Sequence, residues 1–244
     1  MYIPFSPPDM TEKEAKLAYE TILSGWITSG PKKVEFEEKI SQYCGTEKTC
    51  TFNSATAALE LALRFIGVEA GDEVIVPAYT YTASCSVICH VGATPVMVDC
   101  KKDSFEMDYD KMEEAINEKT KVIIPVDLGG VVCDYDKIFE IVEAKKNLFT
   151  PNNDYQKALG RVMVLADSAH GFGAEYKGKK SLEEMQDAMI DALKACRIDI
   201  SNCLTLRHIL QMISLPLSRM QHLTLHRRVN SIILTLRING MKYH

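Results

Sequence analysis

The sequence predicts an α/β protein with three α/β/α layers built around a mostly parallel sheet. Two observations lead to this fold class: five short runs rich in β-branched residues recur along the chain, and segments with helical spacing of apolar residues separate them. Strands that alternate with helices pair in parallel, because each helix crosses over the sheet and covers one face. In such sheets ligands bind at the carboxyl ends of the strands, so we expect the functional residues there.

Two helices are expected before this alternation begins. Thr11 and Glu14 have the spacing of a capping box, in which each side chain accepts a hydrogen bond from the other residue's backbone. This pattern predicts a helix that runs to about Leu23 and ends at a Ser-Gly pair. A second helix is expected over residues 33–43, because Gly45 follows and glycine commonly terminates a helix.

The alternation itself extends from residue 48 to residue 166. Cap-forming side chains mark the helix starts: Asn53 or Ser54, then Asp108, then Asp134. Strands are expected at 48–52, 73–76, 95–99, 121–126 and 162–166, helices at 54–65, 83–91, 108–116 and 134–146, and a polar loop at 151–153.

The pattern changes after residue 181. We therefore expect two parts, a large domain over 1–181 and an atypical tail over 182–244. The tail begins with a second capping-box pattern and an apolar stripe at helical spacing, which predicts an amphipathic helix over 182–196. Residues 231–238 are strand-like and end in Asn239-Gly240, a hairpin signal.

Charge divides the chain at almost the same place. The net charge is −5, yet residues 200–244 contain no Asp or Glu, five Arg and one Lys. This is typical of an arm that binds nucleic acid or a membrane, or of a segment unrelated to the fold before it. Nucleic acid is disfavoured, because Tyr243 is the only aromatic residue of this segment that could stack on bases.

Targeting signals and cysteines bear on the compartment. The sequence contains no apolar run of eighteen residues, and its first residues have no secretory pattern. Its eight cysteines could form disulfides, but reduced and mostly buried thiols fit a chain of this size without an export signal. We therefore expect a cytoplasmic protein that does not enter a membrane.

Three strand-end segments carry residues suited to a ligand. Ser54, Ala55 and Thr56 open a helix with small side chains, so exposed backbone N–H groups and the helix dipole favour an anion such as phosphate. Helix capping by Asn53 or Ser54 explains the same pattern equally well. Tyr79 and Tyr81 follow the next strand, where either ring could stack on a flat heteroaromatic ligand or serve ordinary packing.

The third segment is Leu165-Ala166-Asp167-Ser168-Ala169-His170. Asp167 directly follows an apolar strand, and a buried carboxylate there needs a cation or a hydrogen-bond donor, for which a protonated pyridine nitrogen is suitable. A turn or helix-capping role for Asp167 is the alternative. A Ser-His-Asp hydrolase is disfavoured, because these residue types stand too close along one segment to assemble a triad.

These segments, in this order, resemble the DegT/DnrJ/EryC1/StrS family of sugar aminotransferases that depend on pyridoxal 5′-phosphate (PLP). The resemblance covers residues 3–181, and its motifs are specific only when taken together. It rests on Ile3–Met10, Ser24–Pro31, Phe36-Glu37, Asn53–Leu59, Gly71–Pro77, Asp167–Ala174 and Tyr176–Lys180.

The resemblance implies a fold type I architecture, a homodimer, and transfer of an amino group, commonly from glutamate, to a nucleotide-linked keto sugar. By the same resemblance, Ser54, Ala55 and Thr56 would cradle the PLP phosphate and Tyr81 would stack on the pyridine ring. Asp167 would keep the ring nitrogen protonated, and His170 would lie near the phenolic oxygen.

The sequence departs from the family where the Schiff-base lysine is expected. Residues 181–185 read Ser-Leu-Glu-Glu-Met in place of a Ser-Phe-His-x-x-Lys-Asn stretch, and the later lysines, Lys194 and Lys242, lack that context. The remaining sheet strands and the small domain of the family are also missing. No catalytic residue is therefore assigned, and we expect a chain that is inactive as a transaminase or, alternatively, a non-catalytic ligand-binding protein with the PLP fold.

Overall fold

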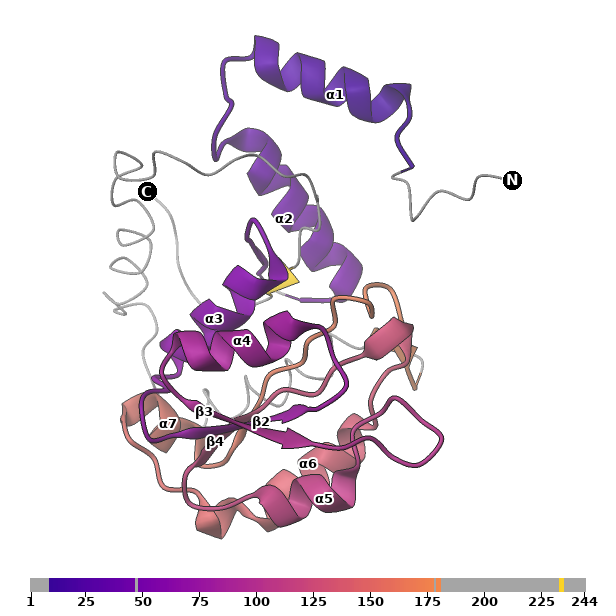
Figure 1. The fold of residues 1–244 in the computed structure, drawn as a ribbon. Helices are drawn as coiled ribbons and strands as arrows, with labels where there is room; N and C mark the ends of the chain where they lie inside the picture. Colours follow the sequence, from indigo (N-terminus) through magenta and orange to yellow (C-terminus); the bar gives the residue numbers. More distant parts are fainter. Residues whose placement is uncertain (1–8, 47, 178, 181–232, 235–244) are drawn as a thin grey trace.

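A computed structural model describes residues 9–46, 48–177, 179–180 and 233–234. The chain forms a central sheet with helices on both faces, and two N-terminal helices lie to one side of it (Figure 1). The fold class expected from the sequence is confirmed.

The N-terminal helices form as their local signals predict. Helix α1 (Glu12–Leu23) begins at the Thr11 capping box and buries none of its residues. Helix α2 (Pro31–Cys44) ends at Gly45 in the left-handed conformation, with φ of 70°, which glycine adopts without steric cost. In Figure 1, α2 lies between α1 and the body of the protein, so α1 is the helix farthest from the sheet.

The main sheet has four parallel strands in the order β3-β2-β4-β5. Its strands match four of the five expected runs, with ends that differ by a few residues. They are β2 (Glu73–Pro77), β3 (Thr94–Val98), β4 (Thr120–Ile123) and β5 (Met163–Val164).

Helices cover both faces of the sheet (Figure 1). One face carries α3 (Ala55–Phe65) and α4 (Thr82–His90), and the other carries α5 (Tyr109–Ala115) and α6 (Tyr135–Ala144). Alternate strand residues supply the two cores, because successive side chains of a strand point to opposite faces. Val74, Val76 and Ile124 pack in the core under α3 and α4, whereas Ile75 and Ile123 pack with α5 and α6.

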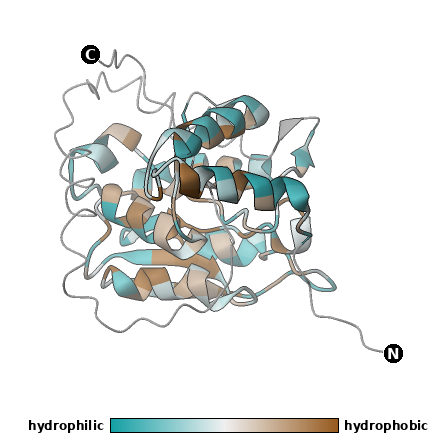
Figure 2. Ribbon diagram, turned by 90° about the horizontal axis from the view of Figure 1, so that it is seen from above, coloured by the Kyte–Doolittle hydropathy of each residue, from teal (hydrophilic) through white to brown (hydrophobic). Residues whose placement is uncertain are grey.

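Figure 2 shows the same division in hydropathy. Brown residues occupy much of the strand ribbons, whereas the helices combine brown and teal residues. This is the pattern of amphipathic helices on a sheet that is buried on both faces. None of the described helices is both long and apolar enough to cross a membrane.

One expectation about these elements is wrong, and one helix was not predicted. β1 (Cys50–Thr51) is not a strand of the parallel sheet but pairs antiparallel with β8 (Ile233–Leu234). The amide of Thr51 also donates to the Glu37 carboxylate of α2 at 2.8 Å, so β1 is tied to α2. The expected loop at 151–153 is present, and it leads into a helix that was not predicted from the sequence, α7 (Asp154–Leu159), which Asn153 caps by accepting from the Gln156 amide.

Short elements complete the described chain. They are the 3₁₀ turns η1 (Leu128–Gly130) and η2 (Lys146–Leu148) and a hairpin of β6 (Glu175–Tyr176) with β7 (Lys179–Lys180). The amphipathic helix expected over 182–196 and the hairpin expected at 239–240 lie outside the described residues.

Candidate functional site

Asp167 continues the sheet beyond the end of β5. Its amide donates to the carbonyl of Pro125 at 2.8 Å, and its carbonyl accepts from the Asp127 amide at 3.1 Å. Val126 and Asp167 form an isolated parallel bridge, which extends β4 and β5 side by side. Both backbone groups of Asp167 are therefore fixed at the carboxyl edge of the sheet.

The Asp167 side chain is 7% exposed and receives two hydrogen bonds. The Ser84 hydroxyl donates to Oδ2 at 2.7 Å, and the Ala169 amide donates to Oδ1 at 3.3 Å. Within the described part of the chain no Lys, Arg or His forms an ion pair with this carboxylate. A buried carboxylate without a cation is costly, so the site suits a ligand that brings a positively charged N–H group.

The first turn of α4 connects Asp167 to Tyr81. Ser84 is fully buried, its hydroxyl is 2.9 Å from the Thr80 hydroxyl, and its amide donates to the Tyr81 carbonyl at 3.2 Å. The Tyr81 side chain is 75% exposed and has no stacking partner among the described aromatic rings, whereas Tyr79 stacks on Phe105 with centroids 5.3 Å apart. Of the two tyrosines, Tyr81 is therefore the one with its ring open to a ligand.

His170 is oriented by the turn that follows β4. Its Nδ1 accepts a hydrogen bond from the Gly129 amide at 3.1 Å, so the proton of the neutral ring is on Nε2. Gly129 has a φ of 65°, in the left-handed region that favours glycine. The exposed imidazole thus presents an N–H donor at the same sheet edge as Asp167.

Ser54, Ala55 and Thr56 stand at the start of α3. The Ser54 hydroxyl accepts from the Ala57 amide at 3.2 Å, so the helix-capping interpretation of this residue is confirmed. The amides of Ala55 and Thr56 lie in the first turn and have no acceptor within the helix, which leaves them suited to an anion. Helices α3 and α4 lie side by side on one face of the sheet (Figure 1), but among the described contacts no hydrogen bond joins Ser54, Ala55 or Thr56 to Asp167 or His170.

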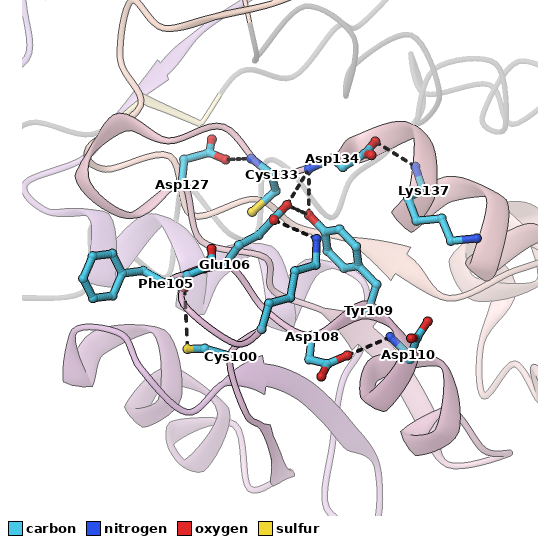
Figure 3. Close-up of polar contacts among 12 residues, drawn as sticks. Cys100, Phe105, Glu106, Asp108, Tyr109, Asp110, Asp127, Cys133, Asp134 and Lys137 are labelled. Atoms are coloured by element: carbon cyan, nitrogen blue, oxygen red, sulfur yellow. Dashed lines mark hydrogen bonds and ion pairs between the residues drawn. The ribbon is translucent and has the colours of Figure 1, made fainter.

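A second polar network lies on the other face of the sheet (Figure 3). The Glu106 carboxylate pairs with Lys101 at 2.7 Å, accepts from the Tyr109 hydroxyl, and accepts from the Asp134 amide at 3.2 Å. Burial by itself would raise the pKa of Glu106, but these three contacts outweigh it and lower the pKa. Burial, together with the Glu106 hydrogen bond, raises the pKa of Tyr109. The network fixes the start of α6, which holds Cys133 and Tyr135 next to Asp127.

We expect the contribution of Glu106 to stability to vanish in acid. A carboxyl group whose pKa is lowered by folding stabilises the protein above its unfolded pKa and loses that effect as the pH falls through the folded pKa. Glu106→Gln should therefore cost about 1–3 kcal/mol of unfolding free energy near neutral pH and progressively less as the pH is lowered to about 3. Urea denaturation across this pH range measures the difference, and Glu140→Gln, which alters a carboxylate that is 70% exposed, is the control. A difference that stays constant with pH would contradict the assignment.

Two residues of the Asp167 site, Ser84 and Asp127, were not predicted from the sequence. Ser84 donates a hydrogen bond to Asp167, and Asp127 accepts a 2.5 Å hydrogen bond from Ser168, the residue that follows Asp167. A signal for Asp127 was present, because it follows the apolar strand β4 as Asp167 follows β5. Ser84 gave no signal of its own, since a serine inside a helix is ordinary.

Known proteins match the part of the chain that carries this site. The model of the DegT/DnrJ/EryC1/StrS aminotransferase family matches residues 8–190. The chain is 39% identical over 180 residues to a GDP-perosamine synthase of Caulobacter vibrioides, which covers 73% of this chain and 44% of the relative. It is 36% identical over 177 residues to the UDP-4-amino-4-deoxy-L-arabinose–oxoglutarate aminotransferase of Shewanella sediminis, covering 72% and 42%.

A solved structure shares the fold as well. The putative sugar aminotransferase Spr1654 from Streptococcus pneumoniae, in its PLP form, superimposes with a TM-score of 0.72 at 61% identity. The match covers 73% of this chain and 46% of that chain. The present chain thus spans less than half the length of these relatives.

Proposed function

The chain belongs to the DegT/DnrJ/EryC1/StrS aminotransferase family, and on that premise we propose that its described residues form the cofactor-binding part of a PLP-dependent nucleotide-sugar aminotransferase. The observation that carries this proposal is Asp167, a buried carboxylate at the sheet edge that has hydrogen-bond donors but no ion pair among the described residues. Pyridine protonated at its ring nitrogen supplies the missing cation. The donor set around Asp167 therefore fits PLP.

Each residue has a distinct role in this proposal. Asp167 keeps a proton on the ring nitrogen, and Ser84 orients its carboxylate for that purpose. Tyr81 stacks on the ring, and His170 donates from Nε2 to the phenolic oxygen. The first-turn amides of α3, at Ala55 and Thr56 beside the Ser54 cap, bind the phosphate. Bound PLP supplies an electron sink for amino-group transfer.

The substrate class follows from the named relatives. GDP-perosamine synthase and the UDP-4-amino-4-deoxy-L-arabinose–oxoglutarate aminotransferase both carry a nucleotide sugar in their names, and the second also names oxoglutarate. We propose a nucleotide-linked keto sugar as amino acceptor and glutamate as amino donor, in a polysaccharide biosynthetic route. A nucleotide-sugar substrate and the free cysteines of the described residues fit a cytoplasmic location.

A homodimer is also part of the proposal. Helix α1 and the segments on either side of it expose large apolar side chains that a partner subunit would cover, and α1 buries none of its own residues. Sedimentation of the full chain over a range of concentrations measures the assembly. The exposed set comprises Met10, Leu17, Tyr19, Ile22, Leu23, Trp26 and Ile27.

We further propose that this chain by itself is not a working transaminase. Residues 181–244 offer Lys194 and Lys242, and neither stands in the context of the family's cofactor-binding lysine. The proposed functional division is therefore a cofactor-binding part over 1–181 and an atypical tail over 182–244.

Titration of the full chain with PLP tests both the proposed cofactor binding and the proposed lack of transaminase activity. We expect saturable, reversible binding, no cofactor covalently attached after borohydride reduction, and no detectable transamination of glutamate. Pyridoxal without its phosphate is the matched probe and should bind at least about tenfold more weakly, because the α3 amides then have no anion. Absence of saturable binding would overturn the cofactor assignment, whereas covalent attachment or turnover would overturn the inactivity.

A further inference from the structure

Asp127 is a second buried carboxylate at the same sheet edge, and the proposed function leaves it without a role. It is fully buried, and among the described residues three neutral groups donate hydrogen bonds to its carboxylate. The Cys133 amide and the Tyr135 hydroxyl donate to Oδ1 at 3.0 and 2.9 Å, and the Ser168 hydroxyl donates to Oδ2 at 2.5 Å. Its charge raises the pKa of Tyr135 further above the rise that burial causes.

The Asp127 contacts join the start of α6 to the segment that follows β5. Figure 3 shows Asp127 beside Cys133 at the entrance to that helix. One carboxylate oxygen faces α6, and the other holds Ser168, the residue next to Asp167. Asp127 therefore links a rigid helix to the backbone that carries the proposed cofactor ligand.

Alternation along the extended strand separates the two carboxylates. The Asp167 side chain lies on the face of α4, where it meets Ser84. Ser168 is the next residue, so its side chain points to the opposite face, where it meets Asp127. The segment is thus held from both faces, and a rotation that would turn Asp167 away from the site is opposed by the Ser168 contact.

The same turn also holds the far end of the segment. The Gly129 amide, two residues after Asp127, donates to His170, and the Gly171 amide donates to the Ser168 carbonyl at 2.9 Å. A Cβ atom at Gly171 would lie 3.0 Å from Asp127 Cβ and Oδ2, so the backbone approaches the carboxylate closely. A side chain at residue 171 would push the two segments apart.

We propose that Asp127 is a positioning residue for the cofactor site, which acts through Ser168 to orient Asp167 and His170 without touching the cofactor. This inference deepens the proposed function and depends on it. A buried charge with only neutral donors contributes little net stability, so its benefit lies in the geometry that it imposes.

Four variants of the full chain test the inference by PLP affinity. Ser168→Ala removes the contact on the site side and should weaken PLP binding about tenfold, and Asp127→Ala should weaken it by at least as much. Asp127→Asn retains the side-chain shape and can still hydrogen-bond Ser168, so it should bind within about threefold of wild type. Tyr135→Phe is the matched control, because it removes a hydrogen bond from the same carboxylate on the α6 side; it should lower stability but leave PLP affinity within about twofold.

The outcomes separate this inference from the proposed function. Wild-type binding that Asp167→Asn weakens but Ser168→Ala does not would overturn the positioning role alone. Equal losses of PLP affinity in Ser168→Ala and Tyr135→Phe would also overturn it, since the effect would then follow stability. If wild type itself showed no saturable PLP binding, the proposed function would be overturned and this inference with it.

Discussion

Replacing Lys121 by alanine should lower the free energy of unfolding by about 3–5 kcal/mol, because it leaves one partner of a buried ion pair uncompensated. Lys121 is 3% exposed, in strand β4, and its Nζ lies 3.8 Å from the Asp72 carboxylate. It also donates to the carbonyls of Glu118 and Thr150 at 3.1 and 2.5 Å. One ammonium group therefore ties β4 to the turn before β2 and to the loop before α7.

Without Lys121, the Asp72 carboxylate and the carbonyls of Glu118 and Thr150 each lose a partner. Asp72 would keep its hydrogen bonds from Asn152 and Glu69, but it would lose its cation. The double variant Asp72→Asn/Lys121→Met replaces both charges and should recover part of the loss, since an apolar group of similar length is often as stable as a buried pair. Neither the single variant nor the double variant should change PLP affinity, because Asp72 and Lys121 lie at the starts of the strands, at the opposite end from the candidate site.

Urea denaturation followed by circular dichroism measures the loss. Lys157→Ala is the matched control, because Lys157 pairs with Asp154 on the surface with exposures of 63% and 92%. It should change stability by no more than about 0.5 kcal/mol. If Lys121→Ala proved as mild as this control, the buried pair would not hold the strands as argued.

The helix starts could be predicted from the sequence because their physical cause is local. Thr11, Ser54, Asp108 and Asp134 each accept a hydrogen bond from an amide within three residues, so the cap and the helix that it begins are neighbours in the chain. Helix α7 was missed although Asn153 and Gly160 flank it with the same kind of signal, because six residues give too little apolar periodicity to detect.

Pairing between distant segments could not be predicted in the same way. The partner of β1 is β8, whose residues are more than 180 positions further along the chain, and two-residue strands carry no periodicity. Contacts within the candidate site are equally hard to predict from the sequence. Asp167 was found from its place after an apolar strand, but its contact with Ser84 depends on which face each side chain occupies, and the sheet register sets that.

The cofactor-binding roles stay predictions for all six candidate residues, which are Ser54, Ala55, Thr56, Tyr81, Asp167 and His170. A substitution at Asp167 best distinguishes a role in cofactor binding from a purely structural role. Asp167→Asn should weaken PLP binding by about 100-fold, which corresponds to about 2.8 kcal/mol. The substitution preserves the size of the side chain and the acceptor for Ser84, so it removes chiefly the charge that would hold a proton on the ring nitrogen.

The same substitution should leave the cofactor-free chain as stable as wild type, or more stable by about 1–2 kcal/mol. A buried carboxylate without an ion pair costs more to bury than a neutral amide, which keeps the 2.7 Å hydrogen bond from Ser84 and gives up only the 3.3 Å hydrogen bond from the Ala169 amide. A residue whose role was to support the fold would show the reverse, with lower stability and unchanged ligand affinity. PLP titration and urea denaturation on one preparation therefore distinguish the two explanations, with Asp154→Asn, which alters a carboxylate that is 92% exposed, as the control. Loss of stability together with wild-type PLP affinity in Asp167→Asn would show that Asp167 serves the fold, and the cofactor assignment would then lack its principal support.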